Sequence, residues 1–303
     1  MPDMSVNLCG VKLKNPVIAA SGTFGNGMEF NEFYPVSRLG GVACKGTTLK
    51  ERQGNPPPRI VETDGGILNS VGLQNPGVDR FISVYLPWLK KQGTAVIANI
   101  AGNTVEEYCE MAEKLSGTDV DIIELNISCP NVKHGGVSFG TSCESVAEVT
   151  SQVKLRSKKP VMVKLTPNVT SIGDIAKAAE DAGADALSLI NTITGMRIDI
   201  KTRRPILRNN TGGLSGPAVF PVAVRMVREV YKRVNIPVVG MGGISKWEDA
   251  AEMMIAGACA VQVGTANFHD PFACVKIIEG LEEFAKSLGL SSITELTGTL
   301  KEW

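Results

Sequence analysis

The chain has 303 residues, which is enough for one large domain or two small ones. Its 31 basic residues balance its 31 acidic residues, so the overall charge argues against a nucleic-acid or anionic-membrane partner. The N-terminus shows no basic segment followed by an apolar one, and no apolar run approaches a membrane span, so we expect a cytoplasmic protein.

Seven cysteines lie at irregular spacing, and no Cys-x-x-Cys motif occurs. This pattern argues for reduced thiols and against a disulfide framework. It also argues against an iron–sulfur cluster held by this chain alone. Cys129, His134 and Cys143 resemble zinc ligands, but a fourth ligand is missing and the spacing is irregular, so we predict no metal site.

Apolar runs typical of buried strands alternate with amphipathic segments along the whole chain. We predict strands at residues 16–21, 41–47, 95–101, 121–128, 160–166, 186–192, 236–242 and 260–265. Between them we predict helices, among them residues 105–115, 145–156, 172–182, 217–234, 247–256 and 271–288. Candidate N-caps of these helices are Thr104, Ser142, Thr170 and Ser245.

Strand–helix units with almost continuously apolar strands indicate a parallel sheet covered by helices. At this chain length, the predicted units suit a closed (β/α)8 barrel, the TIM barrel, better than an open sheet. No linker divides the chain, so we predict a single α/β domain over residues 1–303.

Two connections are too long to be simple loops. Residues 48–74 follow the second strand and predict a hairpin, in which residues 59–62 and 67–69 flank a turn at residues 64–66. Residues 194–216 follow the sixth strand, and their basic residues are Arg197, Lys201, Arg203, Arg204 and Arg208. Both insertions leave the barrel where strands end, so they could cover a site there. The basic cluster could equally belong to a solvated hairpin.

The ends of the last two predicted strands are rich in glycine. Gly242 and Gly243 end the seventh, and Gly264 with Thr265 ends the eighth. Barrels commonly bind phosphate at this place, because backbone N–H groups receive the anion and glycine permits its close approach. These glycines could instead only make tight turns, but two such ends side by side favour a phosphate site.

Lysines and asparagines recur near the predicted strand ends. Lys45 and Lys164 lie in apolar strands, where a buried ammonium needs an anion or an electron-rich ring as partner, unless the side chain reaches solvent between helices. The asparagines are Asn69, Asn99, Asn126, Asn131 and Asn191. Each alone could be a turn residue, but together their amides suit a flat heterocycle such as a pyrimidine or a flavin.

Cys129 lies directly after an apolar strand and directly before Pro130. Because proline cannot donate to a sheet, the strand must end here, which predicts that the thiol lies at the rim of the barrel. A thiolate can act as a nucleophile or as a general base. Cys129 could also be a small buried hydrophobe, but the flanking Asn and Pro residues disfavour that interpretation.

Three segments together resemble the dihydroorotate dehydrogenases: residues 126–131, Lys45 with the three residues that follow it, and residues 69–77. The resemblance covers nearly the whole chain, including both insertions. It implies an FMN-dependent barrel that oxidises dihydroorotate to orotate in pyrimidine (UMP) biosynthesis. In that reaction Cys129 would remove a proton from ring carbon 5, while flavin N5 would accept a hydride from ring carbon 6.

The cysteine at position 129 matches the soluble class 1 enzymes, and we expect no N-terminal extension of the membrane-associated class. Residues 133–136, 139–141, 191–192 and 212–217 resemble the NAD-linked subtype, class 1B. That subtype pairs the barrel with a second subunit that carries FAD and a [2Fe-2S] cluster and passes electrons to NAD. The resemblance also implies a homodimer within a heterotetramer. The fumarate-using class 1A is the alternative.

The resemblance also assigns residues to the two ligands. FMN contacts would be Ser21, Lys45, Gly46, Asn99, Asn126, Lys164, Ile190, Gly216, Gly242, Gly243, Gly264 and Thr265. Substrate contacts would be Lys45, Asn69, Ser70, Val71, Gly72, Leu73, Asn126, Asn191 and Thr192, and we expect Asn131 to position the substrate too. Lys164 would stabilise negative charge on the reduced flavin.

Other functional classes fit parts of this pattern. A flavin-free barrel lyase or isomerase would use Lys164 to form a Schiff base with a phosphorylated substrate. That hypothesis leaves the asparagines and Cys129 without roles. A non-catalytic binding barrel, and a flavin enzyme acting on other dihydropyrimidines, are further alternatives.

Overall fold

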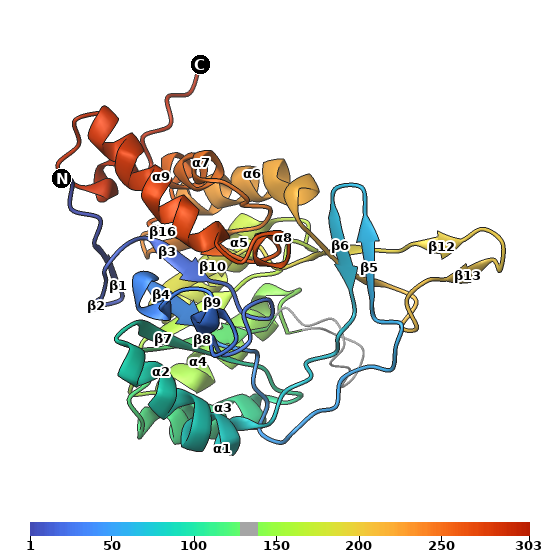
Figure 1. Cartoon of the computed structure of the whole chain (residues 1–303). Coiled ribbons are helices and arrows are strands. Elements are labelled where there is room, and N and C mark those ends of the chain that lie inside the picture. The colour runs from blue at the N-terminus through green and yellow to red at the C-terminus, as the bar shows by residue number, and fades with distance from the viewer. Residues whose placement is uncertain (128–138) are drawn as a thin grey trace.

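Parallel strands closed into a barrel form the body of the chain (Figure 1). The computed structural model describes residues 1–127 and 139–303. Around the barrel the strands are β3 (Val17–Ala19), β4 (Gly41–Ala43), β7 (Ala95–Ile100), β8 (Ile122–Asn126), β9 (Val161–Lys164), β10 (Ala186–Leu189), β15 (Val238–Met241) and β16 (Ala260–Val263). Strand β16 pairs in parallel with β3, which closes the barrel and confirms the predicted (β/α)8 fold.

Each barrel strand lies inside its predicted range, but most end earlier than predicted. Strand β4 ends at Ala43 and β10 ends at Leu189. The residues that follow, such as Lys45 and Asn191, leave the ladder and line the mouth of the barrel. The strand ends are therefore shortened where the chain turns towards the candidate site.

Helices between the strands cover the outside of the barrel (Figure 1). The predicted ones are α3 (Val105–Ser116), α4 (Cys143–Arg156), α5 (Ile172–Asp181), α6 (Phe220–Tyr231), α7 (Trp247–Ala256) and α9 (Ala273–Ser287). Shorter helices that we did not predict are α1 (Val78–Arg80), α2 (Leu86–Gln92), α8 (Ala266–His269), the π-helix Phe81–Tyr85, and 3-10 turns at Phe30–Glu32, Val36–Arg38 and Ile293–Leu296. The predicted helix 217–234 begins as a 3-10 turn at Pro217–Val219. Among the described residues, no helix has both the length and the apolar character that crossing a membrane requires.

Two of the predicted N-caps are confirmed and two are wrong. Thr104 and Ser142 each accept a hydrogen bond from a backbone N–H in the first turn of their helix. The cap of α5 is Ser171 rather than Thr170, because the Ser171 hydroxyl accepts from the N–H of Asp174. Helix α7 begins after Lys246 rather than Ser245, where the Asp249 carboxylate accepts the backbone N–H groups of both residues.

An N-terminal hairpin closes the bottom of the barrel. Strands β1 (Val6–Leu8) and β2 (Val11–Leu13) pair in antiparallel fashion, and neither was predicted. Leu8 and Leu13 are fully buried and pack against one layer of inward-facing barrel residues: Ile18, Ala43, Ile97, Ile122, Met162, Ala186, Val239 and Ala260. This apolar layer leaves the carboxyl ends of the strands as the end of the barrel where polar side chains gather.

The two long insertions join in one antiparallel sheet. The predicted hairpin is confirmed as β5 (Ile60–Thr63) and β6 (Gly66–Asn69). Strand β14 (Gly212–Ser215), from the second insertion, pairs with β6 on one side and with β11 (Ile193–Gly195) on the other. Segments that are far apart in sequence therefore form a single wall beside the mouth of the barrel.

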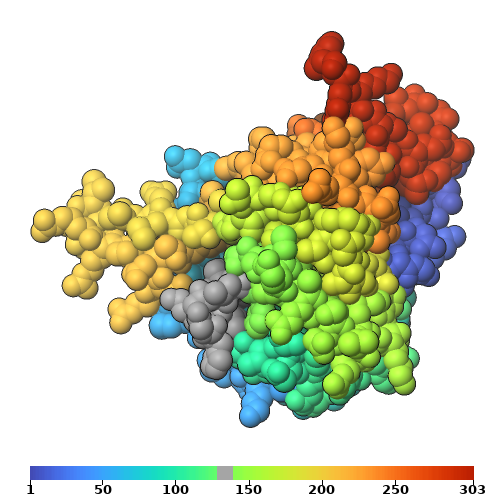
Figure 2. All heavy atoms as spheres, turned by 180° about the vertical axis from the view of Figure 1, so that it is seen from behind, coloured from blue at the N-terminus to red at the C-terminus, as the bar shows by residue number. Residues whose placement is uncertain are grey.

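The basic residues of the second insertion lie on an arm beyond this sheet. Strands β12 (Ile198–Asp199) and β13 (Arg204–Pro205) form a separate hairpin that extends away from the barrel, drawn in yellow in Figure 2. All five predicted basic side chains are exposed. The basic cluster therefore belongs to a solvated hairpin. The antiparallel sheet formed by the two insertions, by contrast, lines the mouth of the barrel.

We expect Leu13→Ala to lower the free energy of unfolding by about 2–5 kcal/mol, because it empties part of the apolar layer that closes the barrel. Leu155→Ala is the matched control, because that leucine is 75% exposed on helix α4. Urea unfolding followed by circular dichroism measures both. Equal losses in the two variants would contradict the role of the N-terminal hairpin as a packed closure.

Candidate active site

A cavity of about 1030 Å³ opens at the carboxyl ends of the barrel strands. The insertion sheet lines one side of it. The predicted FMN contacts that line it are Ser21, Lys45, Gly46, Asn126, Lys164, Ile190, Gly242, Gly243, Gly264 and Thr265. The predicted substrate contacts that line it are Lys45, Asn69, Ser70, Val71, Gly72, Leu73, Asn126, Asn191 and Thr192. The structure thus brings almost every predicted site residue to one cavity.

Cys129 and Asn131 lie outside the described residues, as does His134. The chain reaches this segment from β8, whose last residue, Asn126, lines the cavity. The hydroxyl of buried Tyr108 donates a hydrogen bond of 2.8 Å to the backbone oxygen of Asn126. The described part of β8 is therefore fixed at the cavity up to the start of the Cys129 segment.

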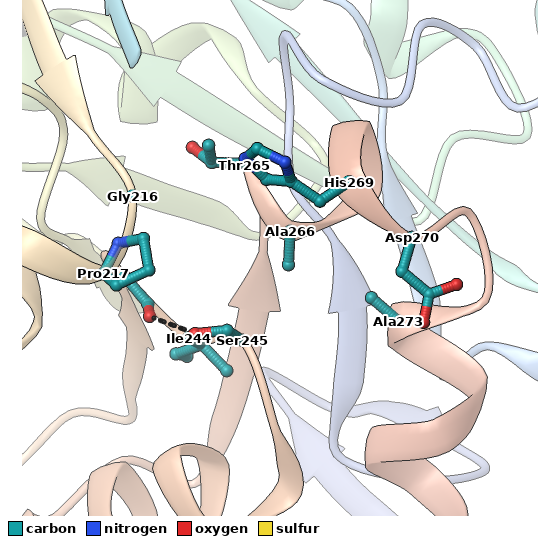
Figure 3. A pocket seen from close by; sticks show the side chains of 10 residues that line it. Gly216, Pro217, Ile244, Ser245, Thr265, Ala266, His269, Asp270 and Ala273 are labelled. Atoms are coloured by element: carbon teal, nitrogen blue, oxygen red, sulfur yellow. Dashed lines mark hydrogen bonds between the residues drawn. The ribbon is translucent and has the colours of Figure 1, made fainter. Parts of the chain in front are cut away.

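A smaller cavity of about 120 Å³ lies at the glycine-rich ends of β15 and β16. Figure 3 shows Thr265 and His269 on one side of it, opposite Pro217 and Ser245. A Cβ on Gly243 would lie 2.7 Å from that of Phe220 and 2.9 Å from the backbone oxygen of Gly216, so only glycine fits this backbone. Gly216, a predicted FMN contact, lines this second cavity.

The electrostatics of the small cavity suit an anion. Its one acidic lining residue, Asp270, is neutralised by Lys276, whose ammonium lies 2.6 Å from the carboxylate. Ser245, Thr265 and His269 contribute polar side chains to the lining. The Thr265 hydroxyl donates to Ser215 Oγ, and the Ser245 hydroxyl donates to the Asp249 carboxylate. The sequence pattern identified the glycines and Thr265, whereas Ser245 and His269 were missed as lining residues.

Both predicted lysines point into the large cavity, so the alternative in which they reach solvent between helices is wrong. Lys164 is only 5% exposed, and no hydrogen bond or ion pair joins its ammonium to another described residue. Burial lowers the pKa of Lys45 below its ordinary value of 10.5, and the nearby Arg59 guanidinium lowers it further. Two cationic side chains therefore face the cavity with few protein anions to pair with them.

A polar layer lies beneath the cavity, next to the apolar layer of the barrel interior. Glu124 of β8 is fully buried and accepts hydrogen bonds from Asn99 Nδ2 (2.5 Å), Ser188 Oγ (2.8 Å) and Gln262 Nε2 (2.7 Å). Asn126 Nδ2 donates to Asn99 Oδ1 at 3.4 Å. The network links strands β7, β8, β10 and β16 across the barrel.

Asn99 is the predicted FMN contact that does not line either cavity. It is 1% exposed and sits in the polar layer, where a Cβ added to Gly46 would lie 2.9 Å from its side-chain oxygen. Its direct contact with a ligand stays a prediction. Its side-chain oxygen accepts from Asn126 and lies close to the backbone of Gly46, and both of those residues line the cavity.

Glu124, Ser188 and Gln262 were missed by the sequence analysis. Each is a polar residue inside an otherwise apolar barrel strand, as in Ile-Glu-Leu at residues 123–125 and Val-Gln-Val at residues 261–263. Because strand residues alternate between the two faces, these positions point into the barrel. That exception to the apolar pattern was the signal that could have found them.

Among the described residues, no three or more His, Cys, Asp or Glu side chains are grouped so that they could hold a metal ion. The cavities instead combine a glycine-rich lining, two lysine side chains and carboxamide groups. This set of groups can bind a phosphate at one end and a flat ring with alternating donors and acceptors at the other.

The chain is similar to known proteins over almost its whole length. A family model for dihydroorotate dehydrogenase matches residues 3–285. A relative in Petrotoga mobilis, the catalytic subunit of dihydroorotate dehydrogenase B (NAD(+)), is 55% identical over 99% of this chain and 100% of its own. Catalytic subunits of the same name in Alkaliphilus metalliredigens and Geotalea uraniireducens are each 55% identical, over 98% and 99% of this chain and 99% and 98% of their own lengths.

We expect Lys45→Met to stabilise the flavin-free protein at pH values near neutrality. A lysine with a lowered folded-state pKa destabilises the fold while it is charged, and this penalty fades as the pH rises through the lowered pKa towards 10.5. The stability gain of the variant should therefore shrink between neutral pH and about pH 10.

Urea unfolding of wild type and variant at both pH values measures this difference. Lys12→Met, at an exposed lysine of β2, controls for the loss of a surface charge. A gain for Lys45→Met that does not change with pH would contradict the buried-cation interpretation.

Proposed function

The chain belongs to the dihydroorotate dehydrogenase family, and from that premise we propose that it oxidises dihydroorotate to orotate with bound FMN in pyrimidine (UMP) biosynthesis. The observation that carries the proposal is the convergence of the predicted FMN and substrate residues on one cavity of about 1030 Å³. A fold shared with many enzymes would not by itself favour this activity. Residues 1–303 would act as one FMN-binding domain.

The residues present fit FMN. The glycine ends of β15 and β16, with Thr265 and Gly216, would hold its phosphate, since no side chain fills that backbone cradle. Lys164 would face the electron-rich part of the ring, where its ammonium lacks a described protein partner. Ser21, Gly46 and Ile190 also line the cavity. When bound, FMN supplies the acceptor for the hydride that leaves ring carbon 6 of the substrate.

The chain's own groups would bind the substrate and move its proton. Dihydroorotate carries a carboxylate, which Lys45 would pair with, thereby offsetting the cost of its own burial. The amides of Asn69, Asn126 and Asn191 can both donate to and accept from the ring's N–H and C=O groups. Cys129 would take the proton from ring carbon 5 as its thiolate, and Asn131 would help to position the ring.

The electrons would leave through a partner. Relatives that match this chain over nearly their full length are named NAD(+)-linked catalytic subunits, a name that implies a further subunit in those proteins. We therefore propose NAD as terminal acceptor, reached through a subunit with FAD and a [2Fe-2S] cluster, in a cytoplasmic heterotetramer built on a homodimer of this chain. A fumarate-using class 1A enzyme is the alternative outcome of the acceptor test.

Anaerobic titration of the purified chain with dihydroorotate tests the proposal. We expect a yellow protein whose visible flavin absorption bleaches as substrate is added. Comparison of NAD with fumarate as oxidant, with and without a co-purifying subunit, then assigns the acceptor. A colourless protein, trapped on phosphorylated substrate by borohydride, would instead support the Schiff-base lyase.

We expect Cys129→Ser to slow flavin reduction at neutral pH by about 10²–10⁴-fold, the usual contribution of a positioned general base. A serine hydroxyl is a far weaker base than a thiolate, whereas orotate binding should change little. In the wild type, the rate of reduction should rise with pH until the thiol has ionised, ordinarily near about pH 8.5. Stopped-flow absorbance measures both.

Cys143→Ser is the matched control, because Cys143 lies at the start of helix α4 and lines neither cavity. It should reduce its flavin at the wild-type rate. Unchanged reduction in Cys129→Ser would remove Cys129 from the role of base.

A further inference from the structure

Glu124 is the one acidic side chain that is buried among the residues the structure describes, with 0% exposure. It stands on the inner side of β8, in the polar layer between the apolar floor and the large cavity. Moving an ionised carboxylate out of water is strongly unfavourable unless hydrogen bonds and charges compensate it. A carboxylate at the centre of a barrel therefore needs hydrogen-bond donors around it.

Neutral side chains from three other strands donate hydrogen bonds to the Glu124 carboxylate. Asn99 donates from β7, Ser188 from β10 and Gln262 from β16, at 2.5, 2.8 and 2.7 Å. An ionised carboxylate can only accept, so both carboxamides must turn their NH₂ groups towards Glu124. Their carbonyl oxygens are thereby directed away from it.

These two oxygens have different surroundings. Asn99 Oδ1 accepts from Asn126, which lines the cavity. Gln262 also lines the cavity, but its Oε1 atom is buried without a hydrogen-bond partner in the described structure. A buried acceptor without a donor destabilises the protein that holds it. Gln262 therefore places an unpaired acceptor at the wall of the cavity.

The same network leaves Lys164 without a salt bridge. Ile122 of β8 and Met162 of β9 both belong to the apolar layer, so Glu124 and Lys164, two residues further along each strand, belong to the next one. The carboxylate accepts from three neutral side chains, and no ion pair joins it to Lys164 in the described structure. Because neutral donors hold the carboxylate, the ammonium stays available to the cavity.

We propose that Glu124 is a positioning residue for the flavin and that Gln262 is a cofactor-binding residue whose side-chain oxygen accepts from a ring N–H. This inference rests on the proposed FMN-dependent function. Glu124 fixes the orientation of both carboxamides and keeps Lys164 free for the ring. Its negative charge beneath the cavity also opposes the accumulation of electrons there.

Glu124→Gln tests the proposal, because the amide keeps the shape, removes the charge and no longer forces its neighbours to donate. We expect the Kd for FMN to rise about tenfold, equivalent to the loss of one or two hydrogen bonds. The midpoint potential of the bound flavin should become more positive, because a negative charge near the electrons it gains is gone. Fluorescence titration of the flavin-free protein with FMN and anaerobic redox titration measure the two quantities.

Glu180→Gln is the matched control. Glu180 of α5 is partly buried, at 11% side-chain exposure, and its carboxylate accepts from Lys177 and from the backbone of Asn235 and Ile236. It lies outside the barrel interior and lines neither cavity. Its loss should leave both the Kd for FMN and the potential at wild-type values, whatever it does to stability.

Gln262→Met removes the carboxamide of Gln262 and leaves the charge of Glu124 in place, so it measures the contribution of the amide alone. It also tests the proposal if Glu124→Gln does not fold. It should weaken FMN binding about five- to tenfold, the loss of one hydrogen bond, while Glu124 keeps its charge and the potential moves less. Wild-type FMN affinity and potential in a folded Glu124→Gln protein, or wild-type affinity in Gln262→Met, would overturn the inference. A wild-type chain that binds no FMN at all would instead overturn the proposed function.

Discussion

The alternation of side chains along the strands of a closed barrel governs the rest of this molecule. Every second residue must point inward, and the interior is too narrow to hold water in the apolar layer. Leu8 and Leu13 close that layer from below. Polar inward residues can then be accommodated only towards the open end, which is where Glu124, Lys164 and Gln262 gather. The apolar layer that stabilises the barrel and the polar layer beside the cavity thus lie only two residues apart along each of these strands.

A second constraint comes from the pairing of β6 with β14. Asn69 stands opposite Gly213 in this ladder, so a residue from the first insertion is held in place by the second. Gly213 cannot carry a side chain, because a Cβ would meet the hydroxyl of Thr192. Residues expected to bind the substrate are therefore positioned by backbone hydrogen bonds between segments more than a hundred residues apart, rather than by local loops.

Much of this could be predicted from sequence, because the decisive signals were local. Apolar strand runs, the turn at residues 64–66 and the glycine-rich ends of β15 and β16 each occupy a few neighbouring residues. The β6–β14 pairing was not predictable in this way, since a short strand containing two glycines has little propensity of its own. The Glu124 network was missed for a related reason: its donors come from three strands, and only the closed barrel brings them together. Thr170 and Ser245 failed as caps because a neighbouring residue offered better geometry.

The closure of β3 against β16 has a consequence for how the protein is made. Val17 pairs with Val261, so one edge of the first barrel strand to leave the ribosome stays uncovered until the last barrel strand has been made. The apolar layer beneath the site is likewise incomplete until Ala260 arrives. A nascent chain therefore carries an unprotected strand edge through most of its synthesis, when edge-to-edge association with other chains competes with folding. Final assembly of the ligand cavity is in this sense a post-translational event.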